Sequence, residues 1–400
     1  MEDVLFVSKF LEIEPVITKK KLYLSMLFVP GVYLMILLST ILTITIGCGI
    51  IFILYFLINK LLGGIGFAIF GVYLLIALPS FGIFIGIISC LMAIISTLFK
   101  KKTFEPAIII NSNEHPKLHQ LILSLSSQMS AKMPDSIILH MKSNFFVSNG
   151  KIRVFNGVAK GRILSISLPL LSIFTVNELR AILAHEFAHF TGRDLIFSRI
   201  VLPVYKGAAT YLEYMTSIFK YQGYDIGIIS LPMLLPNFLM KQYLKMFHKF
   251  NMQLSRIREH RADFIASSIC GHESCSEALG KVVSYGNYFD PLIDEEMSEK
   301  IIHGFEFTNY FKHFREYLDK YSKYVEETYF EALIEDEDKY STHPTLLKRM
   351  SSIPYIEEKY FDEEQSIELL SDFDGLEINM TQQYNYFIYN HLAGSSFMYE

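Results

Sequence analysis

The sequence predicts a mainly α-helical protein with a small β-sheet, preceded by an N-terminal transmembrane helical hairpin. Three features predict this organisation. Two long uncharged runs lie near the N-terminus, apolar residues recur at helical spacing through most of the remaining chain, and short β-rich runs lie between residues 136 and 167. We therefore expect a membrane region followed by a soluble region.

The uncharged runs cover residues 22–59 and 61–99, and only Lys60 divides them. Each exceeds the roughly 20 apolar residues that cross a bilayer, so a buried helix of a soluble core explains them poorly. We predict a transmembrane region over 22–99 with two long or tilted helices; three or four shorter spans are the alternative. The first run is too long for a cleaved secretory signal.

Lysine triplets at 19–21 and 100–102 flank this region. The positive-inside rule places both flanks in the cytoplasm. Alternatively, the lysines only anchor the chain to lipid headgroups, which would not conflict with this orientation. Residues 1–21 are then a short cytoplasmic lead. We expect a multi-pass protein of the inner or plasma membrane whose soluble region faces the cytoplasm.

Composition narrows the choice of partners. The net charge of −5 gives no nucleic-acid signal. Four cysteines are too few for a disulfide scaffold. A metal site built from Cys270, Cys275 and His272 is conceivable, but the pair lacks partner cysteines.

The most informative stretch of the soluble region is His185-Glu-Phe-Ala-His189. On a helix, residues four apart share one face, so the two imidazoles can bind a single metal ion. Glu186 can then act as the base that takes a proton from an activated water. The alternative is an accidental pattern on a surface helix.

The surrounding sequence predicts that this motif lies in one helix of about fifteen residues. Thr175 and Glu178 form a capping box, and Gly192 is a stop signal. Apolar residues recur at helical spacing between them: Leu179, Ile182, Leu183, Phe187 and Phe190.

A catalytic zinc needs a third protein ligand. Glu259 and Asp263 share one face of a later helical segment, where one can bind metal while the other fixes a ligand imidazole. His260 is a competing third ligand, but it points about 100° away from Glu259. Taken alone, this segment is better explained as an exposed helix whose acidic residues pair with neighbouring arginines.

These motifs, followed by Ser341-Thr-His343-Pro344 and Arg349, resemble the HtpX-like and CAAX-prenyl-protease family of membrane zinc metallopeptidases. The resemblance spans roughly residues 20 to 355 and implies a zincin-type metallopeptidase domain over 103–355. It implies that one Zn²⁺ per chain is bound by His185, His189 and Glu259. Glu186 would be the general base and acid.

The resemblance also suggests roles for residues around the zinc. Asp263 would support a zinc histidine, His343 would stabilise the oxyanion, and Arg349 would anchor the segment that carries His343. Asp194 matches a position that is often acidic in the family, where a role at the helix end and a role in supporting a zinc ligand are equally plausible. Taken alone, the His-Pro dipeptide at 343–344 is more typical of a turn.

Substrate is expected to lie along the edge of a small sheet beside the zinc helix. The β-rich runs alternate with Asn-Gly pairs at 149–150 and 156–157, which predict hairpin turns of an antiparallel sheet. The family usually has Asn-Ala before the zinc helix, whereas this chain has Asn144-Phe145. The bulkier side chain puts the shape of the substrate cleft in question.

We therefore expect a membrane zinc endopeptidase that acts on protein or peptide substrates, among which membrane proteins are candidates. An intramembrane zinc protease is one alternative, but the polar residues Asn177, Glu178 and Arg180 lead into the motif. A catalytically inactive membrane scaffold is another, and the intact Glu186 argues against it. Residues 226–240 are expected to be core or a segment that dips into the membrane, and residues 356–400 an acidic C-terminal appendage.

Overall fold

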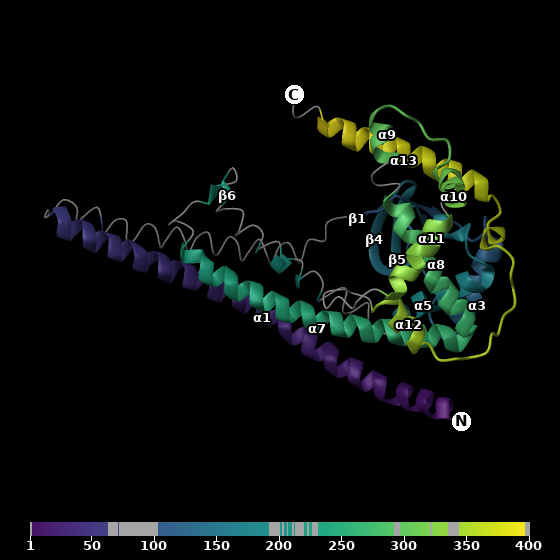
Figure 1. Ribbon diagram of the computed structural model, residues 1–400, viewed down its shortest axis with the longest axis horizontal. Helices are drawn as coiled ribbons and strands as arrows, with labels where there is room; N and C mark the ends of the chain where they lie inside the picture. Colours follow the sequence, from purple (N-terminus) through teal and green to yellow (C-terminus); the bar gives the residue numbers. More distant parts are fainter. Residues whose placement is uncertain are drawn as a thin grey trace. The chain divides into compact units, whose positions relative to one another are not determined.

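The computed structural model describes residues 2–62, 71, 103–191, 201, 204–205, 207–209, 212, 220–221, 224–225, 231–291, 297–320, 322–334 and 344–396. These residues are mostly helical, with a small mixed sheet (Figure 1). The chain divides into two compact units, which we describe separately. The sheet unit comprises 1–11, 102–195 and 255–400, and the long-helix unit comprises 12–101 and 196–254.

The long-helix unit contains most of α1 (Glu2–Leu62) and the first part of α7 (Leu231–Cys270). Within α1, the 32 residues Met26–Leu57 have a mean hydropathy of 2.5 and are long and apolar enough to cross a membrane. Large apolar side chains on this stretch are exposed, among them Leu27 and Phe56. The second predicted helix falls almost entirely outside the described residues, so the hairpin stays a prediction.

Close packing joins α1 to α7 inside this unit. Val32 and Ile36 of α1 form a buried cluster with Met240 and Phe247 of α7, among others. The Tyr243 hydroxyl donates a hydrogen bond to the Phe28 carbonyl at 2.8 Å. A Cβ at Gly31 would collide with that hydroxyl, so glycine permits the approach.

The described part of segment 226–240 forms the start of α7 and continues as helix through Pro236. Its apolar side chains are mostly exposed within the unit: Leu234, Leu235, Phe238 and Leu239. Only Met240 is buried among the large apolar residues of this stretch that the structure describes. This differs from the expected core burial, because apolar residues on all sides of a helix cannot all face one neighbour. The small hairpin β6 (Lys220–Tyr221) and β7 (Tyr224–Asp225) also belongs to this unit.

The sheet unit is built on five strands in the order β1-β4-β5-β3-β2. Their bounds are Thr103–Phe104, Ala107–Ile110, Ser136–His140, Phe146–Val154 and Gly157–Ser167 for β1 to β5. The pairs β1–β4 and β3–β5 are parallel, whereas β2–β3 and β4–β5 are antiparallel. The prediction of an antiparallel sheet is therefore wrong. The β4–β5 hairpin folds back so that β5 lies between β4 and β3, and β5 then runs parallel to β3.

One of the two predicted Asn-Gly turns is present. Residues Phe155–Asn156 link Val154 to Gly157, its partner across the hairpin, close to the predicted turn. The turn predicted at 149–150 is wrong, because both residues lie inside β4 opposite Arg162 and Gly161. The two-residue link Phe155–Asn156 sets the register between β4 and β5, so both strands continue past Asn149 and Gly150 without a turn.

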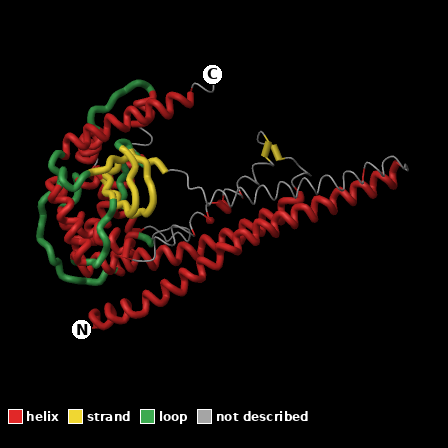
Figure 2. Tube along the Cα trace, turned by 180° about the vertical axis from the view of Figure 1, so that it is seen from behind, coloured by secondary structure: helices red, strands yellow, loops and turns green. Residues whose placement is uncertain are grey.

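Helices cover one face of the sheet (Figure 2). They include α3 (Pro116–Gln128), α5 (Val176–Thr191) and α8 (His272–Pro291). Alternate strand residues, such as Leu139 and Leu164, pack with these helices in the main core. Residues of the opposite parity, such as Ile138 and Ile163, form a smaller cluster on the other face. This is the period-two alternation of a sheet with apolar residues on both faces.

Shorter helices and the C-terminal segment complete the sheet unit. They are α4 (Leu168–Leu171), α9 (Ser298–Ile302), α10 (Tyr310–Lys320), α11 (Ser322–Ile334), α12 (Leu346–Ser352), η3 (Ser366–Leu369) and α13 (Phe373–Ser396). Met380 and Tyr384 of α13 enter the main core, and the fully buried Glu377 pairs with Arg315. The segment predicted as an appendage is thus packed into this unit.

Candidate metal centre

Helix α5 begins with the predicted capping box. The Thr175 N–H donates to a carboxylate oxygen of Glu178 at 2.8 Å, and the Glu178 N–H donates to the Thr175 hydroxyl at 3.2 Å. The helix then runs over Val176–Thr191, so the predicted helix is confirmed. Leu183 and Phe187 are fully buried in the main core, which fixes the rotation of α5 about its axis.

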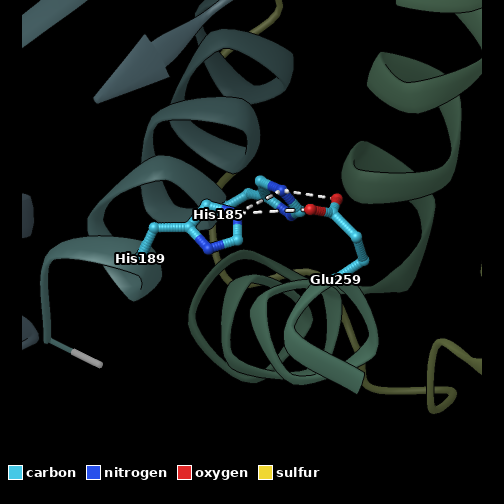
Figure 3. Close-up of side chains that lie close together, drawn as sticks. All are labelled: His185, His189 and Glu259. Atoms are coloured by element: carbon cyan, nitrogen blue, oxygen red, sulfur yellow. Dashed lines mark hydrogen bonds and ion pairs between the residues drawn. The ribbon is translucent and has the colours of Figure 1, made fainter. Parts of the chain in front are cut away.

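His185 and His189 of α5 meet Glu259 of α7 (Figure 3). The two Nε2 atoms are 3.3 Å apart, and Glu259 oxygens lie 3.6 Å from His185 Nε2 and 3.8 Å from His189 Nε2. Ligands about 2.0–2.1 Å from a tetrahedral zinc are separated from one another by roughly 3.3 Å. Two imidazole nitrogens and a carboxylate at these spacings therefore fit a zinc ion.

The competing ligand sets do not assemble. His260 Nδ1 lies 2.8 Å from the Ser352 hydroxyl and is not part of the cluster. Cys270 and Cys275 are buried free thiols, and burial raises the pKa of Cys270 to about 12, which disfavours the thiolate that binds metal. Within the described ranges, His185, His189 and Glu259 form the single cluster with metal-ligand geometry.

A second layer of charge supports His185. Asp263 Oδ1 lies 2.9 Å from His185 Nδ1, which directs the other ring nitrogen, Nε2, toward the cluster. Arg349 of α12 donates two hydrogen bonds to the Asp263 carboxylate, at 2.9 and 2.6 Å. Its guanidinium also lies 3.7 Å from Glu259. Arg349 therefore fixes Asp263, which in turn fixes the His185 ring. The family resemblance indicated a role for Arg349 near the zinc, but no spacing pattern indicated its pairing with Asp263.

The acid–base balance of this layer follows from its contacts. Burial lowers the pKa of His185, but hydrogen bonds to Asp263 and Glu259 outweigh it and raise that pKa to about 10. Burial raises the pKa of Asp263, but the charge and hydrogen bonds of Arg349 outweigh it and hold that pKa well below its usual range. Asp263 is thus a carboxylate at every physiological pH.

Glu186 follows His185 directly and is 8% exposed. No described residue makes a hydrogen bond or ion pair with its carboxylate, although the charge of Arg349 is near enough to be felt. A group that exchanges protons with a reacting molecule must keep its oxygens available.

The predicted substrate segment lies at the start of β4. The Phe145 ring stacks on Phe174 at 5.8 Å and packs against the main core, so its bulk is absorbed there. The helix α5 contacts β4. Asp194 and His343 lie outside the described residues, so their predicted roles stay predictions.

Two features escaped the sequence analysis. Lys281 of α8 forms an ion pair with the buried Glu178, at 2.6 Å, which ties α8 to the start of the motif helix. His140 is buried at the end of β3 and contacts Asn144. Neither residue belongs to a motif, and their partners are distant in sequence or across a turn, so no spacing pattern marks them.

The site combines two histidines one turn apart on a helix, an adjacent glutamate and a carboxylate from a second helix. This arrangement is typical of metal-dependent hydrolases of the HExxH class. The comparison with known families agrees. Residues 112–357, more than half of the chain, match Peptidase family M48, and the chain belongs to that family.

Individual relatives are more distant. A protease HtpX homolog of Persephonella marina is 27% identical over 194 residues, which is 48% of this chain and 64% of the relative. A protease HtpX homolog of Archaeoglobus fulgidus is 22% identical, over 61% of this chain and 72% of the relative. The chain thus spans just under two thirds of the first relative. The crystal structure of S. mikatae Ste24p covers 81% of this chain and 67% of its own at 16% identity, with a TM-score of 0.34.

Proposed function

We propose that the protein is a membrane-bound zinc endopeptidase that hydrolyses peptide bonds of protein substrates. The observation that carries the proposal is the pairing of a three-residue metal cluster with the available carboxylate of Glu186. Membership of Peptidase family M48 supports the peptidase reaction. The candidate span Met26–Leu57 supports attachment to a membrane.

In this proposal His185, His189 and Glu259 hold the zinc ion, which would supply Lewis-acid activation of water and of the scissile carbonyl. Glu186 accepts the proton of the attacking water and passes it to the leaving amine. Asp263 and Arg349 keep the His185 ring in one orientation while this happens. His343 would donate to the oxyanion, and Asp194 would support the end of the motif helix.

The substrate is proposed to lie as an extended strand along the free edge of β4. Strand β1 pairs with β4 only at Ile152 and Arg153, so the stretch from Phe146 to Lys151 has no outer partner in the described chain. An unpaired edge offers backbone donors and acceptors to any extended peptide, whatever its sequence. This suits cleavage of unfolded or loosely folded segments.

We also propose that the sheet unit faces the cytoplasm, from the lysine triplets at 19–21 and 100–102. Reporters fused after residue 105 and after residue 400 should both report cytoplasm. A signal from the opposite side at either position would contradict the hairpin.

The test of the reaction uses the full chain purified in detergent, with metal content and cleavage of an unfolded protein measured on the same samples. We expect about one zinc per chain, loss of cleavage with a chelator and recovery on adding zinc. Glu259→Ala should lose the zinc, because two histidines hold it weakly. His260→Ala, the matched neighbour, should keep both zinc and cleavage.

Three outcomes would contradict the proposal in different ways. Full zinc in Glu259→Ala together with loss in His260→Ala would show that the third ligand is wrong. Cleavage that persists after complete metal removal would exclude zinc catalysis. Zinc binding without cleavage of any substrate would favour the inactive scaffold.

A further inference from the structure

The link between β3 and β4, residues 141–145, is fixed by an unusual set of contacts around His140. This histidine ends β3, is 1% exposed and lies edge-on to Phe146 at 5.5 Å. The Lys142 N–H donates to its Nδ1 at 3.3 Å, so the ring proton is on Nε2. Nε2 then donates to the Asn144 carbonyl at 2.6 Å.

The contacts of the His140 ring require its neutral form. Burial lowers the pKa of His140 to about 4, so at neutral pH the imidazole has one donor and one acceptor, and both are used. The middle of the link is held separately, since the Ser143 hydroxyl donates to the Gly286 carbonyl of α8 at 3.3 Å. His140 therefore fixes the last part of the link, where β4 begins.

The hydrogen-bond pattern of β4 shows what that position controls. The Glu105 N–H donates to the Arg153 carbonyl, so the backbone groups of Arg153 point away from β5 toward the outer edge. In an antiparallel strand this direction alternates, and the register of β4 with β5 is unbroken from Phe146 to Val154. Val147, Asn149 and Lys151 therefore present their N–H and C=O groups at the free edge.

By the same alternation, the Asn144 carbonyl points to the side of β5 and β3. The ladder between β4 and β5 ends at Phe146 opposite Ser165, so Asn144, which a continued register would place opposite Ser167, lies beyond the paired residues of β4. The imidazole of His140 takes the place of the missing strand partner. It holds Asn144 in line with β4, so Phe145 presents its N–H and C=O outward as the next rung of the edge.

We propose that His140 is a positioning residue for substrate, which extends the docking edge of β4 by one rung at Phe145 and so fixes the register in which a peptide lies beside the metal centre. This proposal rests on the proposed function. It predicts that His140 acts on substrate binding and on the choice of scissile bond, not on zinc or on proton transfer.

The experiment compares two amides of similar size in the full-length protein. In His140→Gln the amide nitrogen takes the place of Nε2 and can still donate to Asn144. In His140→Asn the side chain reaches only the place of Nδ1, so the contact with Lys142 survives and the contact with Asn144 is lost. Ile138→Val, a buried change on the same strand face, controls for mild loss of stability.

We expect His140→Asn to raise KM about 5- to 10-fold, as the loss of one well-placed hydrogen bond would, with kcat within about twofold and zinc unchanged. The cleavage sites in an unfolded substrate, mapped by mass spectrometry, should shift or broaden. Hydrogen exchange of residues 144–148 in the free protein should accelerate. His140→Gln and Ile138→Val should resemble the wild type in all of these measurements.

The possible failures are distinguishable. Faster exchange in His140→Asn with unchanged KM and cleavage sites would make the contact purely structural and overturn the proposal. A parallel fall in kcat and zinc content would show general damage and overturn it too. Absence of cleavage by the zinc-loaded wild type would instead overturn the proposed function.

Discussion

Helix α5 contains two buried glutamates, eight residues apart, whose carboxylates have different surroundings. Glu178 at its start is 1% exposed, accepts the Thr175 N–H and forms an ion pair with Lys281. Glu186 near its end is 8% exposed and has no hydrogen-bond or ion-pair partner among the described residues. The glutamate at the start of α5, Glu178, is thus bound by neighbouring groups. The glutamate near its end, Glu186, remains available to a reacting molecule.

Helix α5 thus has a structural glutamate at its start and a glutamate available for reaction near its end. Glu178 fixes the start of α5 against α8, which determines where the later turns of the helix lie. Glu186 lies on one of these later turns, next to His185, and its carboxylate is not restrained by neighbouring side chains.

The largest effect should come from Glu186→Gln, which keeps the side-chain shape but removes the proton acceptor. Cleavage should fall by about 10⁴-fold, because one group serves both proton transfers. Zinc content and thermal unfolding in detergent should match the wild type, since no neighbour loses a partner. Cleavage equal to that of the wild type, with zinc bound, would remove Glu186 from the mechanism and end the contrast with Glu178.

The matched change Glu178→Gln should reverse this profile. Removing one charge of a buried ion pair costs about 3 kcal/mol in unfolding free energy, while kcat of the folded fraction stays within a few-fold of the wild type. The measurement is chemical or thermal unfolding beside cleavage kinetics over a range of substrate concentrations. The double variant with Lys281→Met removes the unpaired cation and should recover most of the stability. A stable Glu178→Gln protein with poor kcat would show that the two ends are not separate.

Features with local sequence signals could be predicted, and features that depend on distant contacts could not. Helix α5 with its capping box was predicted because its signals are local: Thr175, Glu178 and the apolar spacing lie within a few turns. The approach of Glu259 to the histidines followed from the family resemblance and its i,i+4 partner Asp263. Local spacing alone left His260 and Glu259 as alternatives, and the rotation of α7 relative to α5 distinguishes them in the structure.

What the sequence could not predict depends on contacts between distant segments. The parallel pairing of β3 with β5 depends on how the β4–β5 hairpin folds back against β3. No turn signal within residues 136–167 indicates this arrangement. The Asn149-Gly150 dipeptide suggested a turn, yet the register set at Phe155–Asn156 overrides it. Lys281 looks like an ordinary surface cation in the sequence, and its ion pair with Glu178 depends on the packing of α8 against α5. The pairing of Arg349 with Asp263 likewise depends on the approach of α12 to α7.

The stability of the fold should also depend on pH through His140, a buried titratable residue outside α5. His140 is neutral in the folded state because burial lowers its pKa to about 4, whereas the unfolded value is near 6.5. The unfolded state therefore binds more protons between these values, so this contribution is present above pH 6.5 and is lost as pH falls toward 4. It amounts to about 3 kcal/mol over that window.

The measurement for His140 is the unfolding temperature between pH 7.5 and 4.5 in the wild type and in His140→Gln, which has no titrating ring. The wild type should lose more stability than the variant below pH 6.5, and the difference should grow as pH falls. Identical pH profiles would show that the imidazole is not held neutral in the fold.

The smallest effect sharpens the contrast at the metal end of α5, where Asp263 is partnered and Glu186 is not. Asp263→Asn keeps an acceptor for His185 but loses the charge that Arg349 binds through two hydrogen bonds. Zinc affinity should fall by about 10- to 100-fold, as when the partner of a ligand histidine is changed, because the ring is less firmly oriented and less basic. Competition with a chelator of known affinity measures the change, and Glu186→Gln, one residue from the same histidine, is the control that should keep wild-type affinity. An equal loss in both variants would mean that Glu186 also supports the ligands, and the division between partnered and available carboxylates would then fail at this end of the helix.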